Sequence, residues 1–224
     1  MKPIFCIVGQ TGAGKNYMLD LLLHNNELLN YGKLYNLVYS TTRAKREGEV
    51  NGKDYNFKDN TQYAHESASN CIVESRAYDT INNGRVYYYT TKDEIENINQ
   101  KFNGIICTAS VDQALSYYKK YNNVYFIVID TPIKVRMNRI INSRINKDAD
   151  DIEYLELCRR IVNENEEFNK IWSVINEHNS IVVHNNSDIV KYRTKIFKKY
   201  FKINLNEVED IDKFIYEKIR ESSL

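Results

Sequence analysis

The sequence predicts an α/β fold of three layers, in which helices cover both faces of a parallel central sheet. Short apolar runs recur along the chain, and segments of helical character follow most of them. The apolar runs cover residues 4–8, 34–39, 105–107, 124–129 and 180–183. Continuous apolar strands are typical of parallel sheets that are buried on both faces. Strands that alternate with helices favour the same arrangement.

Helical segments separate these runs. The expected helices cover residues 17–23, 111–121, 152–168 and 208–219, and a further helix starts at Thr131 and Pro132. Threonine is a good N-cap residue. Proline suits the first helical position, because the backbone N–H that it lacks would have no partner there.

The segment from residue 40 to 92 interrupts this pattern. Residues 71–89 suggest two strands around Asn83-Gly84, the favoured pair for a tight hairpin turn. We therefore expect one domain over residues 1–224 with a small β-rich insertion. Its expected parts are a core of residues 1–39, 93–136 and 159–224, a subdomain of residues 40–92 and a helical lid of residues 137–158.

The composition is that of a globular protein. The chain has 224 residues, of which 42% are hydrophobic and 27% charged, and its formal net charge is +1. This charge gives no reason to expect binding to nucleic acid or to a membrane surface. No apolar run reaches the roughly 20 residues of a membrane span. The four cysteines are widely spaced without a C-x-x-C pair, so we expect reduced, buried thiols in a cytoplasmic protein.

A glycine-rich loop follows the first apolar run. Residues 9–15 read G-Q-T-G-A-G-K, which fits the phosphate-loop (P-loop) pattern G-x-x-x-x-G-K between a strand and a helix. Backbone N–H groups of such a loop surround a phosphate, and the helix N-terminus adds its positive end. Lys15 is placed to reach the β- and γ-phosphates of a nucleotide. The residues expected to bind the phosphates of ATP are Gly9, Thr11, Gly12, Ala13, Gly14, Lys15 and Asn16.

The last position of the motif departs from the usual pattern. Asn16 stands where a serine or threonine hydroxyl normally binds Mg²⁺. Mg²⁺ prefers oxygen ligands and keeps several waters, so an amide oxygen is a suitable replacement. We expect Mg²⁺ to bind together with ATP, with Asn16 as the candidate ligand. The departure bears more on full activity than on nucleotide binding.

A second anion site is indicated after residues 34–39. Arg43 and Arg46 are three residues apart, and both can point at one anion. Two guanidinium groups suit a phosphate monoester, because each offers a fork of donors. Ser40 and Tyr55 add hydroxyls for the remaining phosphate oxygens.

This segment closely resembles the GMP-binding segment of guanylate kinases. Residues 40–57 read S-T-T-R-A-K-R-E-G-E-V-N-G-K-D-Y-N-F, with Glu47 where that family usually has proline. The resemblance covers most of residues 4–168. It implies a P-loop fold with a small subdomain that binds the nucleoside monophosphate, NMP, and with a helical lid. The GMP-binding residues that it implies in this segment are Ser40, Arg43, Arg46 and Tyr55.

The resemblance also implies residues for the base and for the acceptor phosphate. Glu74 matches a glutamate that accepts hydrogen bonds from N1–H and the 2-amino group of guanine. Tyr89 matches the phosphate-binding tyrosine of a Y-Y-G-T motif, but Tyr78 and Tyr88 are rivals because the spacing from Glu74 is longer than usual. The family's D-x-D carboxylates are absent here, and Ser110 stands at the second of these positions as a candidate contact to the base.

Lid arginines are expected to neutralise charge on the transferred phosphoryl group. The catalytic residues that the resemblance implies are Lys15, Arg139, Arg144 and Arg160. Arg136 is an alternative, because the spacing of the first two lid arginines is one residue wider than usual. An asparagine that contacts adenine in the family is matched by Asn185-Asn186 or by Asn204.

The resemblance therefore predicts an ATP:GMP phosphotransferase that uses Mg²⁺ with ATP and acts on GMP or dGMP. We expect a monomer or a homodimer that binds neither nucleic acid nor a membrane. One alternative is a (deoxy)nucleoside monophosphate kinase of shifted specificity. The other is a non-catalytic GMP-binding or interaction module, which Asn16 and the missing carboxylates favour.

Overall fold

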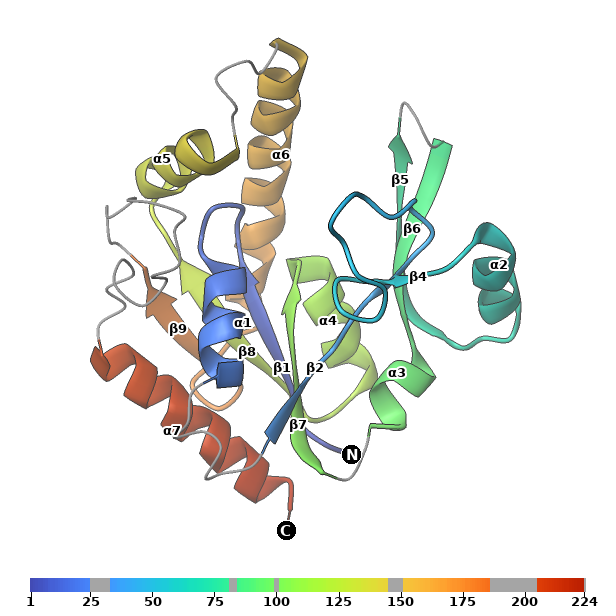
Figure 1. The fold of residues 1–224 in the computed structure, drawn as a ribbon. Helices are drawn as coiled ribbons and strands as arrows, with labels where there is room; N and C mark the ends of the chain where they lie inside the picture. The colour runs from blue at the N-terminus through green and yellow to red at the C-terminus, as the bar shows by residue number, and fades with distance from the viewer. Residues whose placement is uncertain (25–32, 81–83, 99–100, 145–150, 186–204, 224) are drawn as a thin grey trace.

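The computed structural model has an α/β core of three layers with a second, smaller sheet at its side (Figure 1). It describes residues 1–24, 33–80, 84–98, 101–144, 151–185 and 205–223. The predicted α/β class and the parallel central sheet are confirmed. No helix within the described ranges is both long enough and apolar enough to cross a membrane.

The central sheet contains five parallel strands in the order β2-β7-β1-β8-β9. Their bounds are β1 Ile4–Gly9, β2 Lys33–Asn36, β7 Phe102–Ala109, β8 Val124–Asp130 and β9 Ser180–His184. Every apolar run of the sequence overlaps one of these strands, although β2 ends at Asn36 and does not extend to residue 39. Strand β1 lies in the middle, where Cys6 pairs with Cys107 on one side and with Phe126 on the other. The loop that follows β1 therefore emerges at the centre of the carboxyl edge.

Helices bury their apolar faces against both sides of this sheet. The main helices are α1 Lys15–His24, α4 Val111–Lys120, α5 Ile133–Arg144, α6 Asp151–Asn169 and α7 Leu205–Glu221. Met18 of α1 and Ile215 of α7 belong to one buried cluster, with Ile7 and Ile127 of the sheet. Tyr117 of α4 and other side chains form a second cluster on the opposite face. Burial of one large aliphatic side chain is worth about 1.5–3 kcal/mol, so these two clusters hold the layers together.

The start of α5 differs from the sequence prediction. The helix begins at Ile133, one residue later than expected, so Pro132 and not Thr131 directly precedes it. The Thr131 hydroxyl instead donates a hydrogen bond of 3.3 Å to the carbonyl of Ala13 in the P-loop. This carbonyl also accepts hydrogen bonds from Arg139 and Asn185, so Thr131 is one of three side chains that bind the P-loop there.

Residues 40–91 form the small sheet, in the order β4-β3-β6-β5. Its elements are β3 Ser40–Thr41, β4 Asn56–Phe57, α2 Asn60–Ala68, β5 Ile72–Thr80 and β6 Gly84–Thr91, followed by α3 Lys92–Glu96. Strands β5 and β6 form the expected antiparallel hairpin, although residues 81–83 of its turn lie outside the described part of the chain. Helices α2 and α3 were not expected from the sequence; they start with capping boxes at Asp59 and Thr91.

The cysteines depart in part from the expectation of buried thiols. Cys6 and Cys107 are buried, Cys71 is half-buried and Cys158 is exposed on α6. All four are free thiols. Cys158 is exposed because the α6 turn that carries it does not pack on the sheet; its neighbours Leu155 and Val162 are also exposed.

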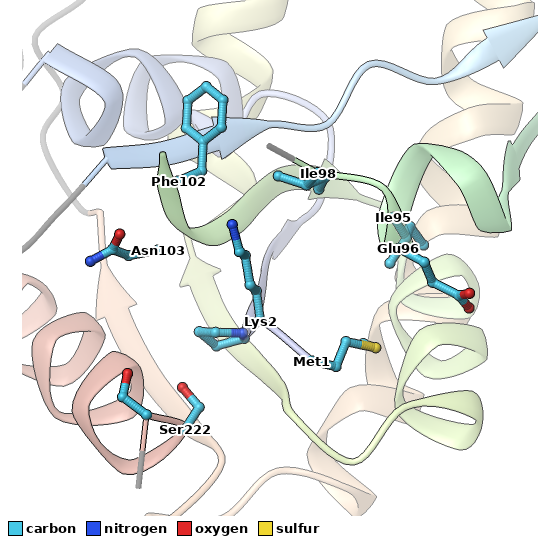
Figure 2. A pocket seen from close by; sticks show the side chains of 10 residues that line it. Met1, Lys2, Ile95, Glu96, Ile98, Phe102, Asn103 and Ser222 are labelled. Atoms are coloured by element: carbon cyan, nitrogen blue, oxygen red, sulfur yellow. The ribbon is translucent and has the colours of Figure 1, made fainter. Parts of the chain in front are cut away.

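A hollow of about 520 Å³ opens at the amino edge of the central sheet (Figure 2). Met1 and Lys2 line it just before β1, Phe102 lines it at the first residue of β7, and Ser222 lines it beyond the end of α7. The P-loop lies at the carboxyl edge, so this hollow is at the other end of the strands and is separate from the site described below.

We predict that Gly12→Ala destabilises the fold more than Gly48→Ala. Both glycines have left-handed φ angles, of +81° and +82°. A Cβ on Gly12 would lie 2.8 Å from the carbonyl oxygen of Arg136, whereas a Cβ on Gly48 would have no atom within 4 Å. The left-handed conformation costs an L-residue about 1–2 kcal/mol in both variants, and crowding adds about 1–3 kcal/mol at Gly12 only.

The free energy of unfolding of the two variants is to be measured by urea denaturation, followed by circular dichroism. Equal losses of stability would contradict the close packing of α5 against the P-loop.

Candidate active site

The P-loop connects β1 to α1 at the carboxyl edge of the sheet. Gly12 and Gly14 have φ angles of 81° and 104°, in the region that only glycine adopts readily. The Lys15 ammonium donates a hydrogen bond of 2.6 Å to the carbonyl of Gly9 at the start of the loop. The loop is therefore closed on itself, and its lysine lies against its first residue.

Two buried side chains bind the P-loop from its carbonyl side. Arg139 of α5 donates to the carbonyls of Gly12 and Ala13 at 3.1 and 3.2 Å, and to Oδ1 of Asn185 at 3.0 Å. The Asn185 amide donates to the same Ala13 carbonyl at 3.0 Å. Since buried carbonyls need donors, this arrangement leaves the loop free to turn its N–H groups to the other side.

Arg136 supports the same loop one helical turn earlier. Its guanidinium donates to the carbonyls of Thr131 and Thr11, at 3.2 and 3.4 Å, and to Oδ1 of Asn165 at 3.2 Å. Burial lowers its pKa, and the carboxylate of Glu164 acts in the opposite direction. Arg136 and Arg139 therefore both contact the P-loop backbone, as donors to its carbonyls.

Helix α6 contacts the loop directly through Glu164. One carboxylate oxygen accepts a hydrogen bond of 2.6 Å from the backbone N–H of Thr11, and the other accepts one of 2.6 Å from the Thr11 hydroxyl. The neighbouring Asn165 accepts a hydrogen bond from the amide of Gln10. The Glu164 carboxylate thus accepts hydrogen bonds from two donors of the P-loop, whose sequence motif is suited to binding phosphate.

Two further arginines that the sequence analysis expected to act in catalysis, Arg144 and Arg160, are described only by their positions in the chain. Arg144 is the last residue of α5, and Arg160 lies on α6 one turn before Glu164. The side chains of both arginines lie outside the part of the structure that is described.

On the small sheet, Arg43 is the centre of a group of aromatic and acidic side chains. Its guanidinium forms a two-pronged ion pair with Glu49, at 2.7 and 3.0 Å, and its Nε donates to the Tyr88 hydroxyl at 3.0 Å. It also lies over the ring of Tyr55, 5.4 Å from the ring centre. The hydrogen bonds from Arg43 lower the pKa of the Glu49 carboxyl. Arg46 is exposed nearby, and its backbone N–H donates to Glu49 at 2.7 Å.

Two of the expected GMP-binding residues lie on the opposite face of the small sheet. Ser40 and Tyr89 are paired between β3 and β6, and both are fully buried. The Ser40 hydroxyl donates to Glu94 at 2.5 Å, and the Tyr89 hydroxyl donates to Glu66 at 2.7 Å. Side chains of a strand alternate between faces, so Tyr88, not Tyr89, lies beside Arg43.

A buried carboxylate lies on the same face as Tyr88. Glu74 pairs with Thr90 between β5 and β6, and only 7% of Glu74 is exposed. Its Oε1 accepts hydrogen bonds from the Gln113 amide at 3.0 Å and from the Thr90 hydroxyl at 3.4 Å. Burial raises its pKa, and these hydrogen bonds partly offset that effect. Ser110 is the N-cap of α4 and bonds to Gln113, so it belongs to this group only through that glutamine.

An ion-pair cluster connects this face of the small sheet to the core. Arg76 lies two residues from Glu74 on β5 and contacts Glu167 of α6 at 3.2 Å and Asp112 of α4 at 3.5 Å. Because strand residues two apart share a face, the face that carries Glu74 is turned toward α4 and α6.

Few oxygen ligands for a metal ion are gathered in the described residues. No group of three or more histidine, cysteine, aspartate or glutamate side chains suited to a metal occurs among them. Asn16 is exposed in the first turn of α1, and Asp130 ends β8 beside the P-loop with 41% of its side chain exposed. These donors fit a Mg²⁺ ion that keeps several waters and binds mainly through nucleotide phosphates.

Sequence reasoning missed Glu164, Gln113 and Glu49 as members of the site. Glu49 lies three residues after Arg46, and its opposite charge could have indicated an ion pair with one of the two arginines. Glu164 and Gln113 contact residues 153 and 39 positions away. No local pattern marks such contacts.

Comparison with known proteins bears on the identity of this fold. The sequence profile described as guanylate kinase matches residues 1–196. The guanylate kinase of Caldanaerobacter subterraneus subsp. tengcongensis is 27% identical, over 99% of this chain and 96% of that protein. The guanylate kinase of Thermotoga maritima is 28% identical, over 92% and 95%. That of Mycoplasma pneumoniae is 30% identical over 67% of this chain, and this match spans 59% of the bacterial protein.

The fold comparison agrees with the sequence profile. The crystal structure of guanylate kinase from Anaplasma phagocytophilum superposes with a TM-score of 0.53, at 16% identity, and covers 99% of this chain and 86% of that one. A profile match over nearly the whole chain, together with a P-loop between β1 and α1, identifies the family. The protein belongs to the guanylate kinase family.

Proposed function

We propose that this protein transfers the γ-phosphoryl group of ATP to GMP or dGMP. The observation that carries the proposal is the face of the small sheet that turns toward the core. It presents a buried carboxylate, Glu74, and the strand residue Tyr88 that holds Arg43. A carboxylate suits the two donors of guanine, and an arginine suits a phosphate. The P-loop supplies the second nucleotide site.

For ATP, the proposal assigns the phosphates to the P-loop N–H groups and to Lys15. The helix dipole of α1 adds favourable potential there. Mg²⁺, when bound with ATP, supplies charge neutralisation on the phosphates. Asn16 is the chain's own candidate to hold it.

For the acceptor, the proposal assigns the phosphate to Arg43, Tyr55 and Tyr88, with the exposed Arg46 beside them. It assigns the guanine base to Glu74. Ser40 and Tyr89, which the sequence placed in this list, are better assigned to support of the small sheet, because their hydroxyls bond to Glu94 and Glu66.

For the transition state, the proposal assigns charge stabilisation to Lys15, Arg144 and Arg160. Such stabilisation depends on donors positioned before the reaction begins. Arg139 contributes indirectly: it donates hydrogen bonds to the carbonyls of Gly12 and Ala13 and so positions the P-loop. Residues 137–158 are proposed as the lid, which carries Arg144, and Arg160 follows two residues after it on α6.

A non-catalytic GMP-binding module is the second candidate function. It is favoured by the contact of Glu164 with Thr11, where a carboxylate uses donors that a phosphate would need. Asn16 and the absence of the D-x-D carboxylates point in the same direction.

The test is a coupled assay of ADP release with Mg-ATP and a panel of GMP, dGMP, AMP, CMP and UMP. We expect turnover with GMP or dGMP and little with the others. Lys15→Met is the control, because it removes the P-loop ammonium. Turnover with another acceptor alone would indicate shifted specificity, and GMP binding without any turnover would indicate the binding module.

We predict that Glu164→Ala tightens ATP binding by about tenfold, because the γ-phosphate no longer competes with a carboxylate for Thr11. Hydrogen bonds to charged groups are worth about 1.5–3 kcal/mol, and about 1.4 kcal/mol corresponds to tenfold in affinity. The fluorescence of Trp172, the single tryptophan of the chain, is a suitable probe because it lies in the turn η2 Lys170–Ser173 directly after α6.

Glu166→Ala is the matched control, since Glu166 is exposed on the same helix. Weaker ATP binding in Glu164→Ala would show that Glu164 supports the nucleotide site and does not compete for it.

We predict that Arg160→Ala lowers kcat by about 10³-fold or more, as is usual for an arginine that stabilises the transferred phosphoryl group. The affinity for GMP should change by only a few fold, because Arg160 is assigned to the transferred phosphoryl group and not to GMP. Steady-state kinetics with GMP measure both quantities. Arg159→Ala, at an exposed position next to it, is the control. A variant with full kcat would remove Arg160 from the mechanism.

A further inference from the structure

The two oxygens of the Glu74 carboxylate have unequal surroundings. Both hydrogen bonds that Glu74 accepts end on Oε1, from Gln113 at 3.0 Å and from Thr90 at 3.4 Å. Among the described residues, none of the hydrogen bonds found ends on Oε2. Oε2 is not a buried atom without a partner, so it retains accessible surface. One oxygen is thus used to hold the group, and the other can accept from a ligand.

The orientation of the Gln113 amide is determined by the start of α4. Its Oε1 accepts hydrogen bonds from the backbone N–H of Ser110 at 3.1 Å and from the Ser110 hydroxyl at 3.3 Å. Gln113 and Ser110 form the capping box of this helix. A flipped amide would set its NH₂ group against an N–H donor and its carbonyl against a carboxylate. The NH₂ group must therefore face Glu74.

The position of the second donor to Glu74, the Thr90 hydroxyl, is also fixed by a neighbouring side chain. The Thr90 hydroxyl lies 2.7 Å from the hydroxyl of Tyr117, and both residues are fully buried. A hydroxyl has one hydrogen. When Thr90 donates to Glu74, Tyr117 donates to Thr90. Glu74 thus receives two donors whose positions are set by α4 and by the hairpin.

The titratable groups that influence Glu74, or that Glu74 influences, lie on its own strand, on α4 and on β1. Arg76 on its own strand and Lys120 of α4 favour the ionised carboxylate, while Cys6 of β1 and Tyr117 of α4 are neutral neighbours whose own pKa values Glu74 helps to raise. Burial is the largest influence on Glu74 and raises its pKa, and the hydrogen bond from Gln113 is the largest opposing one.

We infer that Gln113 is a positioning residue for guanine recognition, which holds the Glu74 carboxylate in the orientation that accepts hydrogen bonds from N1–H and the 2-amino group. This inference rests on the proposed function only for the identity of the ligand. Gln113 stands close to the positions where the family's usual carboxylates are absent, and it acts on the base through Glu74.

The test is the equilibrium binding of GMP to Gln113→Leu over a range of pH, by titration calorimetry. We expect about tenfold weaker binding at neutral pH, the usual effect of one lost hydrogen bond to a charged group. Loss of a hydrogen bond to the ionised form raises the pKa of Glu74. The acid side of the binding profile should therefore move to higher pH, while ATP affinity stays unchanged.

Two further variants separate positioning from a loss of helix capping. Gln62→Leu removes the equivalent capping-box glutamine of α2 without contact to Glu74, and should leave GMP binding unchanged. Gln113→Glu keeps an acceptor for Ser110 but sets a second carboxyl group against Glu74. It should bind GMP weakly, and most weakly at high pH, where both groups are ionised.

An unshifted pH profile in Gln113→Leu, or an equal loss of GMP and ATP binding, would overturn the inference. Absence of GMP binding in the unaltered protein would overturn it together with the proposed function. If the unaltered protein binds GMP but shows no turnover, the proposed reaction fails, and the pH profiles still decide the role of Gln113.

Discussion

A P-loop can turn its backbone N–H groups toward a phosphate only if its carbonyl groups are satisfied on the other side. Arg139 and Asn185 meet this requirement for Gly12 and Ala13, and Thr131 adds a third donor. A buried polar group left without a partner costs about 1–3 kcal/mol. Helix α5, the end of β9 and the loop after β8 are therefore held in place by the backbone of one short loop. The position of α5 relative to the P-loop follows from this constraint.

Acidic side chains of the chain itself bind the groups that the proposed function assigns to phosphates. Glu49 forms the ion pair with Arg43, and Glu164 accepts from the N–H and the hydroxyl of Thr11. A formal net charge of +1 is consistent with such local neutralisation. Under the proposed function, the two nucleotide phosphates would compete with Glu164 of α6 and with Glu49 in the loop after β3.

Side chains alternate between the two faces of the small sheet, and under the proposed function one face supports the sheet while the other binds GMP. The face with Ser40 and Tyr89 packs beneath α2 and α3, where Tyr63 stacks on Tyr87. The other face carries Glu74, Arg76 and Tyr88, and Arg76 joins it to α4 and α6. Consecutive tyrosines of one strand therefore have different roles.

Local pattern determined the α/β class, the approximate places of the five strands of the central sheet, the P-loop between β1 and α1 and the segment of the small sheet that carries Arg43 and Arg46. These features depend on periodicity, glycine conformation and the order of neighbouring residues, all of which can be read along the chain. The tertiary structure alone decided that Tyr88 lies beside Arg43, that Glu164 contacts Thr11 and that Gln113 holds Glu74. Those contacts join residues 45, 153 and 39 positions apart. They depend on strand register and on the packing of α4 and α6, which no local segment of the sequence specifies.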